Sequence, residues 1–188
     1  MRVFDNIFDK KFLDDFSYKL RYTTWNTYNI ANRKTWPYGE KGTHRLLGNV
    51  LFDRKSIDII KYHDDLELSY EAIKMFYAIQ AKSNKNLQLE QIITNCQFMG
   101  MDGTNHTDVI DSKAKEYSFI LMLCDEIIDD NQGGEFINQT LEETVPFRYG
   151  RVIEFETHDL HRGMSFKEPH IVRYSLKFVG KENANIHI

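Results

Sequence analysis

The segment G-R-V-I-E-F-E-T-H-D-L-H, Gly150 to His161, joins a short β-like run to a polar end that holds two histidines. Its first part is rich in β-branched and aromatic residues, which favours a strand. We expect His158 and His161 to lie in the loop that follows this strand. A loop of this kind can supply one ligand of a metal site if other ligands come from elsewhere in the chain.

Further strand-like segments follow residue 90, separated by turn-rich pieces: I-I-T-N-C-Q-F-M, Y-S-F-I-L-M-L-C, G-E-F-I-N and I-V-R-Y-S-L-K-F-V. Before residue 90, apolar residues recur at helical spacing in Phe8–Leu20, with Asp9 as a cap, and in Ala72–Ile79, after Ser69. Thr23–Arg45 is rich in aromatic, Asn and basic residues and is expected to be extended or looped. Helices followed by strands predict an α+β fold, a sandwich or barrel with helices on one side.

The composition limits the classes of protein to which the chain can belong. Its 188 residues are 41% hydrophobic, without a break in composition, which predicts a single domain over residues 1–188. Cys96 and Cys124 are its only cysteines, and we expect two reduced, buried thiols in the cytoplasm. The charged N-terminal stretch and the lack of a long apolar run predict neither a signal peptide nor a membrane span. A net charge of -4 argues against binding of duplex nucleic acid, although a local basic groove stays open.

The stretch N-H-T-D at residues 105–108 is a candidate for the other metal ligands. In a strand, residues i and i+2 share a face, so His106 and Asp108 can offer a nitrogen and an oxygen to one ion. The pair alone is a weak signal, because a surface turn has the same composition. Another copy, at His63-Asp64-Asp65, suits the cap and first turn of the following helix instead. A non-haem iron(II) site of two histidines and one carboxylate would need a distal histidine as well.

From about residue 92 to 179 the chain resembles the iron(II)- and 2-oxoglutarate-dependent dioxygenases, in particular the compact group similar to prolyl 4-hydroxylases. The pieces that carry the resemblance occur in order: H-T-D at 106–108, G-G-E-F at 133–136, P-F-R-Y-G at 146–150, V-I-E-F-E-T-H-D-L-H at 152–161 and R-Y-S-L at 173–176. The resemblance implies a double-stranded β-helix, a cupin-like jelly-roll with N-terminal supporting helices. Residues from about 91 to 180 would form the jelly-roll core with the metal site, and those from about 1 to 90 a helical and looped support.

The same resemblance implies roles for single residues. His106, Asp108 and His161 would bind iron(II), with His161 preferred to His158 because its distance from the strand-end Phe is the usual one in the family. Arg173 and Ser175 of R-x-S would bind the distal carboxylate of 2-oxoglutarate, for which a guanidinium fork is suited. Gln97, which shares one face of its strand with Asn95, is the expected third contact to 2-oxoglutarate.

Other interpretations of the last strand stay open at this stage. Its alternation is also what an apolar core face and a wet polar face would give. If Arg173 points into the barrel, the alternation turns Lys177 inward too. Either Lys177 then lies at the open end of the barrel or a bulge changes the alternation there. Arg33–Arg45 combines basic and aromatic residues and either covers the mouth of the site as a lid or is a solvated surface loop.

The activity implied by the resemblance is hydroxylation of a C–H bond with O2, in which 2-oxoglutarate is converted to succinate and CO2 and ascorbate has a supporting role. The substrate would be a protein or peptide, with prolyl residues included, or a small molecule. Two alternatives remain. One is a cupin-like metalloenzyme that does not use 2-oxoglutarate, in which Arg173 would have no cosubstrate to bind. The other is a non-catalytic jelly-roll module for binding or structure, in which the histidines and Asp108 are incidental.

Overall fold

The computed structural model describes residues 1–29, 46–54, 60–126 and 132–183. The segment Arg33–Arg45, expected to be either a lid or a solvated surface loop, therefore lies outside the described residues. In chain order the elements are β1 (Arg2–Phe4), α1 (Lys10–Tyr22), β2 (Asn26–Asn29), β3 (Leu46–Arg54), β4 (Ile60–Tyr62), α2 (Leu66–Ser83), β5 (Leu87–Gln97), β6 (Glu116–Cys124), β7 (Phe136–Asn138), β8 (Glu143–Val145), β9 (Val152–Glu156), β10 (His161–Gly163) and β11 (Arg173–Glu182).

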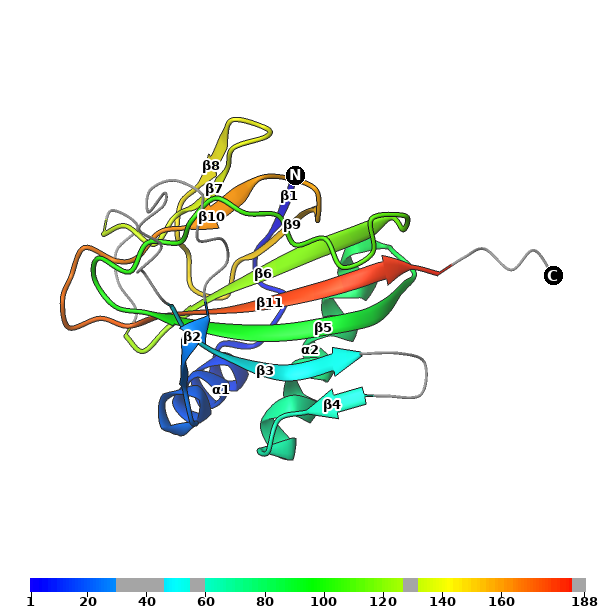
Figure 1. Ribbon diagram of the computed structural model, residues 1–188. Coiled ribbons are helices and arrows are strands. Elements are labelled where there is room, and N and C mark those ends of the chain that lie inside the picture. The colour runs from blue at the N-terminus through cyan, green and yellow to red at the C-terminus, as the bar shows by residue number, and fades with distance from the viewer. Residues whose placement is uncertain (30–45, 55–59, 127–131, 184–188) are drawn as a thin grey trace.

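Two antiparallel sheets form the body of the protein (Figure 1). The 8-stranded sheet has the order β1-β9-β6-β11-β5-β3-β2, with β4 paired to β3, and the 3-stranded sheet has the order β10-β7-β8. Helices α1 and α2 cover one side of the large sheet, and the small sheet lies on the other side (Figure 1). This arrangement confirms the predicted α+β class.

Strand β6 is buried on both of its faces because it lies between the helices and the small sheet. Phe119 and Leu121 join the core on the helical side, whereas Ile120 and Met122 join the core between the two sheets. A strand covered on both faces has no need of polar residues on alternate positions. This explains the nearly continuous apolar run in the sequence of β6.

Both helices begin at an aspartate cap. Asp9 accepts hydrogen bonds from the backbone N–H of Lys11 at 2.9 Å and of Phe12 at 3.3 Å, as predicted for the first helix. Asp65 caps α2 by accepting from Leu68 N at 3.0 Å. The second helix thus begins at Leu66, as the acidic residues after His63 predicted, whereas the start after Ser69 that the apolar spacing indicated is too late. An aspartate in front of the first turn satisfies an otherwise unpaired N–H, so the helix starts there and includes Ser69.

The first 90 residues were predicted to form a support of helices and loops, but they also contribute strands to the large sheet. Strand β3 pairs with β5 from Leu47, opposite Cys96, to Asp53, opposite Gln91, and β1 pairs with β9. The pairing of β3 shifts register between Val50 and Phe52. Because this irregularity interrupts the two-residue alternation, periodicity alone does not identify the strand.

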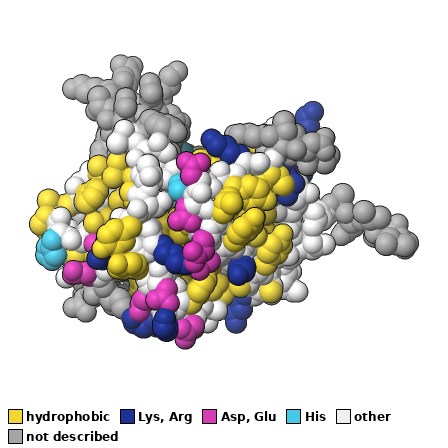
Figure 2. All heavy atoms as spheres, turned by 90° about the horizontal axis from the view of Figure 1, so that it is seen from below, with side chains coloured by type: hydrophobic (Ala, Val, Ile, Leu, Met, Phe, Trp, Pro, Cys, Tyr) yellow, Lys and Arg dark blue, Asp and Glu magenta, His cyan; other side chains and the backbone are white. Residues whose placement is uncertain are grey.

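Seen from the helical side, the surface mixes hydrophobic and charged side chains (Figure 2). Lys19 of α1 donates hydrogen bonds to two carboxylates of α2, Glu67 at 2.6 Å and Glu71 at 2.7 Å. Such surface pairs contribute at most about 1 kcal/mol, so the buried apolar face of each helix is the main attachment to the sheet. Of the described helices, none has the length and apolar character that a membrane crossing requires.

The two cysteines provide a simple test of the packing. Cys96 and Cys124 are free thiols in the core, and burial raises the pKa of each to about 12. We expect neither thiol to react with a thiol-specific reagent such as DTNB at pH 8 in the native protein, and both to react after unfolding in guanidinium. Rapid reaction of either one without unfolding would contradict this packing.

Candidate functional site

A backbone bridge brings two distant histidines side by side. His106 N donates to His161 O at 3.0 Å, and His161 N donates to His106 O at 2.9 Å. Their ring centroids are 4.4 Å apart. His161 is the first residue of β10, so its predicted place in a loop is wrong, and the N-H-T-D stretch is not a strand, so its predicted strand context is wrong as well. The single bridge at His106 still orients this residue as a strand would, because it fixes the backbone of His106 beside β10.

Asp108 completes the cluster from the same loop. Its backbone N–H donates to Thr157 O at 2.9 Å, which ties the loop to the end of β9. Its Oδ1 is 3.6 Å from His106 Nε2, and its Oδ2 is 3.4 Å from His161 Nε2. One potential ligand atom from each of these three residues lies within 4.8 Å of the other two. The structure thus brings together all three residues that the sequence nominated as metal ligands, whereas His158 is exposed and outside the group.

The hydrogen bonds of the imidazoles define which nitrogen faces the centre of the cluster. His106 Nδ1 lies 2.7 Å from Thr104 O, and His161 Nδ1 lies 2.8 Å from Asp159 O. A carbonyl oxygen only accepts, so both Nδ1 atoms carry a hydrogen, and the Nε2 atoms are the ones that face the centre of the cluster. Burial, together with the neighbouring His161, lowers the pKa of His106 to about 4, which keeps this ring neutral.

The Asp108 carboxylate is ionised although it is buried. Burial alone would raise its pKa, but the Lys177 ammonium holds the pKa well below its usual range. Lys177 Nζ donates to Oδ1 at 2.8 Å, and Ser118 Oγ donates to Oδ2 at 2.8 Å. Two neutral imidazole nitrogens and one carboxylate oxygen are the donor set of a non-haem iron(II) centre, so these residues fit that metal.

The cluster opens into a cavity of about 310 Å³ between the two sheets. Its wall comes from β5, β10 and β11 and from the loop that carries the cluster. The described residues that line it are Leu46, Gln91, Ile93, Asn95, Gln97, Gly103, His106, Thr107, Asp108, Val109, Ile110, Ile120, Phe136, His161, Gly163, Arg173, Ser175 and Lys177. This volume suits a small organic ligand.

Arg173 lies in the wall of this cavity with only 1% of its surface exposed. Its Nη1 donates to Gln97 Oε1 at 2.5 Å and its Nε donates to Gly134 O at 3.1 Å, and both partners are neutral. Among the described residues, no carboxylate lies within ion-pair distance of this guanidinium. Burial lowers the pKa of Arg173 to about 10, and the Glu135 carboxylate, beyond ion-pair distance, partly opposes this shift, so the group remains a cation at neutral pH. A buried cation with neutral partners is stabilised by an anionic ligand.

Close backbone approach makes room for this guanidinium. A Cβ at Gly163 would lie 3.3 Å from Arg173 Nη2, so a larger residue at this position would crowd it. Gln97 donates its amide N–H groups to Met101 O at 2.7 Å and Gly163 O at 3.2 Å. The Gln97 side chain is thus fixed at both ends of its amide, by backbone carbonyls on the nitrogen and by Arg173 on the oxygen. From the cavity wall it holds the guanidinium in its orientation. Ser175 is buried in the wall beside them.

The direction of Lys177 is settled by the register of β11. Pairing with β5 continues without a break from Arg173, opposite Gln97, to Val179, and the first irregularity falls between Val179 and Gly180. Lys177 therefore points to the same side as Arg173 and lines the cavity, and no bulge precedes it.

Two polar residues of β6, Glu116 and Ser118, support the cluster but were not predicted to do so, although they stand out in an apolar strand. Ser118 holds Asp108, as described above. Glu116 accepts from the backbone N–H of Ile110 at 2.9 Å and of Asp111 at 3.1 Å, which fixes the loop after Asp108. A buried polar residue in an otherwise apolar strand has a hydrogen-bonding task, and this is the signal that could have found them.

Removing the Ser118 hydroxyl should weaken the metal site without dismantling it. Loss of a hydrogen bond to a ligating carboxylate lowers metal affinity by about 10- to 100-fold. We therefore expect Ser118→Ala to raise the dissociation constant for Zn2+ by such a factor in isothermal titration calorimetry. Ser17→Ala, which removes a buried hydroxyl in α1, is the matched control. Unchanged affinity in Ser118→Ala would show that the contact does not support the cluster.

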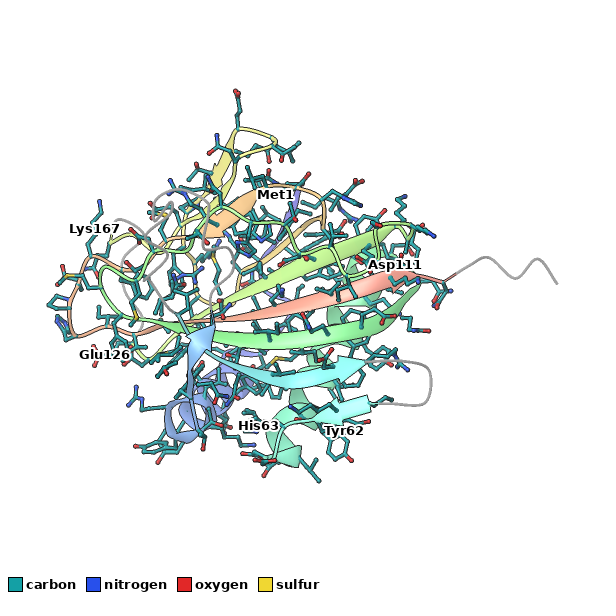
Figure 3. All side chains as sticks on the ribbon, viewed as in Figure 1. Met1, Tyr62, His63, Asp111, Glu126 and Lys167 are labelled. Carbon is teal, nitrogen blue, oxygen red and sulfur yellow. The ribbon has the colours of Figure 1, made fainter. Side chains whose placement is uncertain are left out.

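The other His-Asp copy has the structural role that its sequence suggested. His63 lies next to β4 at the start of α2, away from the small sheet (Figure 3). Its Nδ1 accepts from Asp65 N at 3.0 Å, and its Nε2 lies 2.9 Å from Asn49 Nδ2. The interpretation of this stretch as a helix start is thus confirmed.

The sequence matches no family model and no curated protein. Solved structures match its fold. An oxidoreductase of the 2OG-Fe(II) oxygenase family from Burkholderia pseudomallei superposes with a TM-score of 0.69 at 14% identity, covering 94% of this chain and 82% of that one. A prolyl-4-hydroxylase from Pseudomonas putida gives a TM-score of 0.61 at 11% identity, covering 97% of this chain and 92% of that one.

Structures with other activities have the same fold. The non-heme alpha ketoglutarate dependent epimerase SnoN from nogalamycin biosynthesis gives a TM-score of 0.61 at 9% identity, covering 96% of this chain and 77% of that one. At these identities the comparison establishes the fold, and it confirms the predicted double-stranded β-helix with supporting helices.

Proposed function

We propose that this protein is an iron(II)- and 2-oxoglutarate-dependent dioxygenase that hydroxylates a C–H bond of its substrate. The observation that carries the proposal is the placement of Arg173, a buried cation with neutral partners, in the same cavity as the His106, Asp108 and His161 cluster. A dicarboxylic acid that binds a metal at one end and a guanidinium at the other accounts for both features. The fold of the solved structures supports this interpretation.

In this proposal His106, Asp108 and His161 hold iron(II), while Arg173 and Ser175 bind the far carboxylate of 2-oxoglutarate. Gln97 and the Gly134 carbonyl orient the guanidinium. Bound iron(II) supplies the activation of O2, with conversion of 2-oxoglutarate to succinate and CO2 and with ascorbate in a supporting role. Around it, the Phe136 and Phe155 rings pack against His161 and exclude water from that side.

The substrate in this proposal is a protein or peptide, prolyl residues included, or a small molecule. The two buried free thiols favour a reducing compartment, which we take to be the cytoplasm. A cupin-like metalloenzyme without 2-oxoglutarate is disfavoured, because Arg173 would then be a buried cation with no anion to bind. A non-catalytic module is disfavoured by the two imidazoles that converge with Asp108 at an open cavity.

Turnover of 2-oxoglutarate without added substrate tests this function. The purified protein is supplied with iron(II), ascorbate, O2 and 2-oxoglutarate, and succinate is measured. We expect succinate to form at a slow rate that exceeds both a metal-free sample and a zinc-loaded sample. Absence of succinate above these controls, together with absence of iron-dependent 2-oxoglutarate binding, would refute the proposal.

A further inference from the structure

We propose that Lys177 binds an anionic group of the substrate, so that the preferred substrates are carboxylates or similar monoanions. This inference rests on the proposed function and specifies the class of substrate. Lys177 stands four positions after Arg173 on the same side of β11, which separates the two Cα atoms by about 13 Å along the strand. The cavity thus has one side-chain cation at each end of its β11 wall.

The position of Lys177 relative to the metal cluster is the first argument. Its Nζ donates to Asp108 Oδ1 at 2.8 Å, and 15% of its side chain is exposed. A flexible ammonium with partial access to the cavity can bond to Asp108 and to a bound ligand at the same time, because it has three donors. The hydrogen bond to Asp108 is the one polar contact that the described residues provide for this ammonium. Donors therefore remain for a ligand that lies beside the metal.

The charge balance of the loaded cavity is the second argument. Among the described residues that line it, Asp108 is the one acidic residue, whereas Arg173 and Lys177 are the basic ones. At the metal end, iron(II) and Lys177 would bring three positive charges, against one negative charge of Asp108 and one of the nearer carboxylate of 2-oxoglutarate, while the far carboxylate and Glu135 lie on the side of Arg173. An excess of one positive charge at a partly buried site is costly, and one anionic group on the substrate removes it.

A purely structural role for Lys177 makes a different prediction. If the ammonium serves only to hold Asp108, its loss changes metal affinity and leaves the choice of substrate charge unaffected. If it binds substrate, its loss reduces the preference for anionic ligands. Both quantities are measurable on one set of variants.

The experiment uses protein loaded with Zn2+ and saturated with 2-oxoglutarate, so that no turnover occurs and the Arg173 site is filled. The probes are N-acetyl-amino-acid carboxylates and the corresponding methylamides, which differ in one charge. Their dissociation constants are measured by ligand-observed NMR for the wild type, Lys177→Met and Lys177→Arg. Lys181→Met is the matched control, because Lys181 lies further along β11 and pairs with Asp111 outside the cavity.

We expect the wild type to bind at least one carboxylate probe about tenfold or more tightly than its methylamide, as one charge-assisted hydrogen bond would give. Lys177→Met should lose most of this preference, while Lys177→Arg and Lys181→Met retain it. Absence of a carboxylate preference in the wild type, or an unchanged preference in Lys177→Met, would overturn the proposal. The 2-oxoglutarate affinity of the same samples is measured first. Its absence would refute the proposed function itself, whereas its presence without a carboxylate preference refutes only the role of Lys177.

Discussion

Replacing Arg173 with Leu is expected to weaken binding of 2-oxoglutarate by about 30-fold to several thousand-fold, because loss of one partner of a buried charge pair costs about 2–5 kcal/mol. The guanidinium is buried, has neutral protein partners and faces the cavity. An exogenous carboxylate in the cavity can therefore form the direct ion pair that the described residues do not make with Arg173. The dissociation constant for 2-oxoglutarate is measured on zinc-loaded protein by calorimetry.

Controls separate this loss from unfolding. Arg148→Leu removes an exposed guanidinium that pairs with Asp5 on the surface, and it should leave 2-oxoglutarate affinity unchanged. Gln97→Leu keeps the cation but removes its orienting oxygen, so a smaller loss is expected. Retention of zinc binding in Arg173→Leu shows that the cluster is still formed. If Arg173→Leu binds zinc and also binds 2-oxoglutarate as the wild type does, Arg173 is not the carboxylate site.

Loss of a ligand from the cluster should abolish turnover altogether. We expect Asp108→Ala and His161→Ala to lower iron(II) affinity by more than about 100-fold and to abolish succinate formation. Even an indirect contact to a ligand is worth about 10- to 100-fold, and these substitutions remove a ligand atom itself. Anaerobic titration with iron(II), followed by metal analysis after gel filtration, measures the stoichiometry.

His158→Ala is the matched control for the cluster, since it removes an exposed imidazole from the loop that leads to His161. It should retain one iron per chain and full turnover. Loss of iron binding in His158→Ala, with retention in His161→Ala, would reverse the assignment of the distal ligand.

Much of this architecture follows from local patterns in the sequence. The five β-like segments after residue 90 are strands, and the Asp9 cap begins the first helix. The resemblance to the dioxygenases, which rests on the order of short motifs, implied His106, Asp108 and His161 as ligands, and the structure brings them together. Spacing selected His161 over its neighbour, and burial separates the two in the structure.

Features that depend on pairing over long distances were not predictable in this way. Strand β3 was missed because its register shift interrupts the alternation. The N-H-T-D stretch was expected to be a strand, but only His106 pairs, since the loop is held by contacts to Thr157 and Glu116 from other elements. The contact between Lys177 and Asp108 joins residues 69 positions apart, and no local pattern encodes it.

The most direct test of the central claim is an anaerobic titration of the iron(II)-loaded protein with 2-oxoglutarate, followed by visible absorption. Chelation of iron(II) by a 2-oxo acid gives a charge-transfer band, so the titration reports whether the His106, Asp108 and His161 cluster and Arg173 act on one ligand. We predict a saturable band with one 2-oxoglutarate per iron, which is absent in Asp108→Ala and requires far more 2-oxoglutarate in Arg173→Leu. Full iron loading without any band, or a band that Arg173→Leu leaves unchanged, would contradict the account.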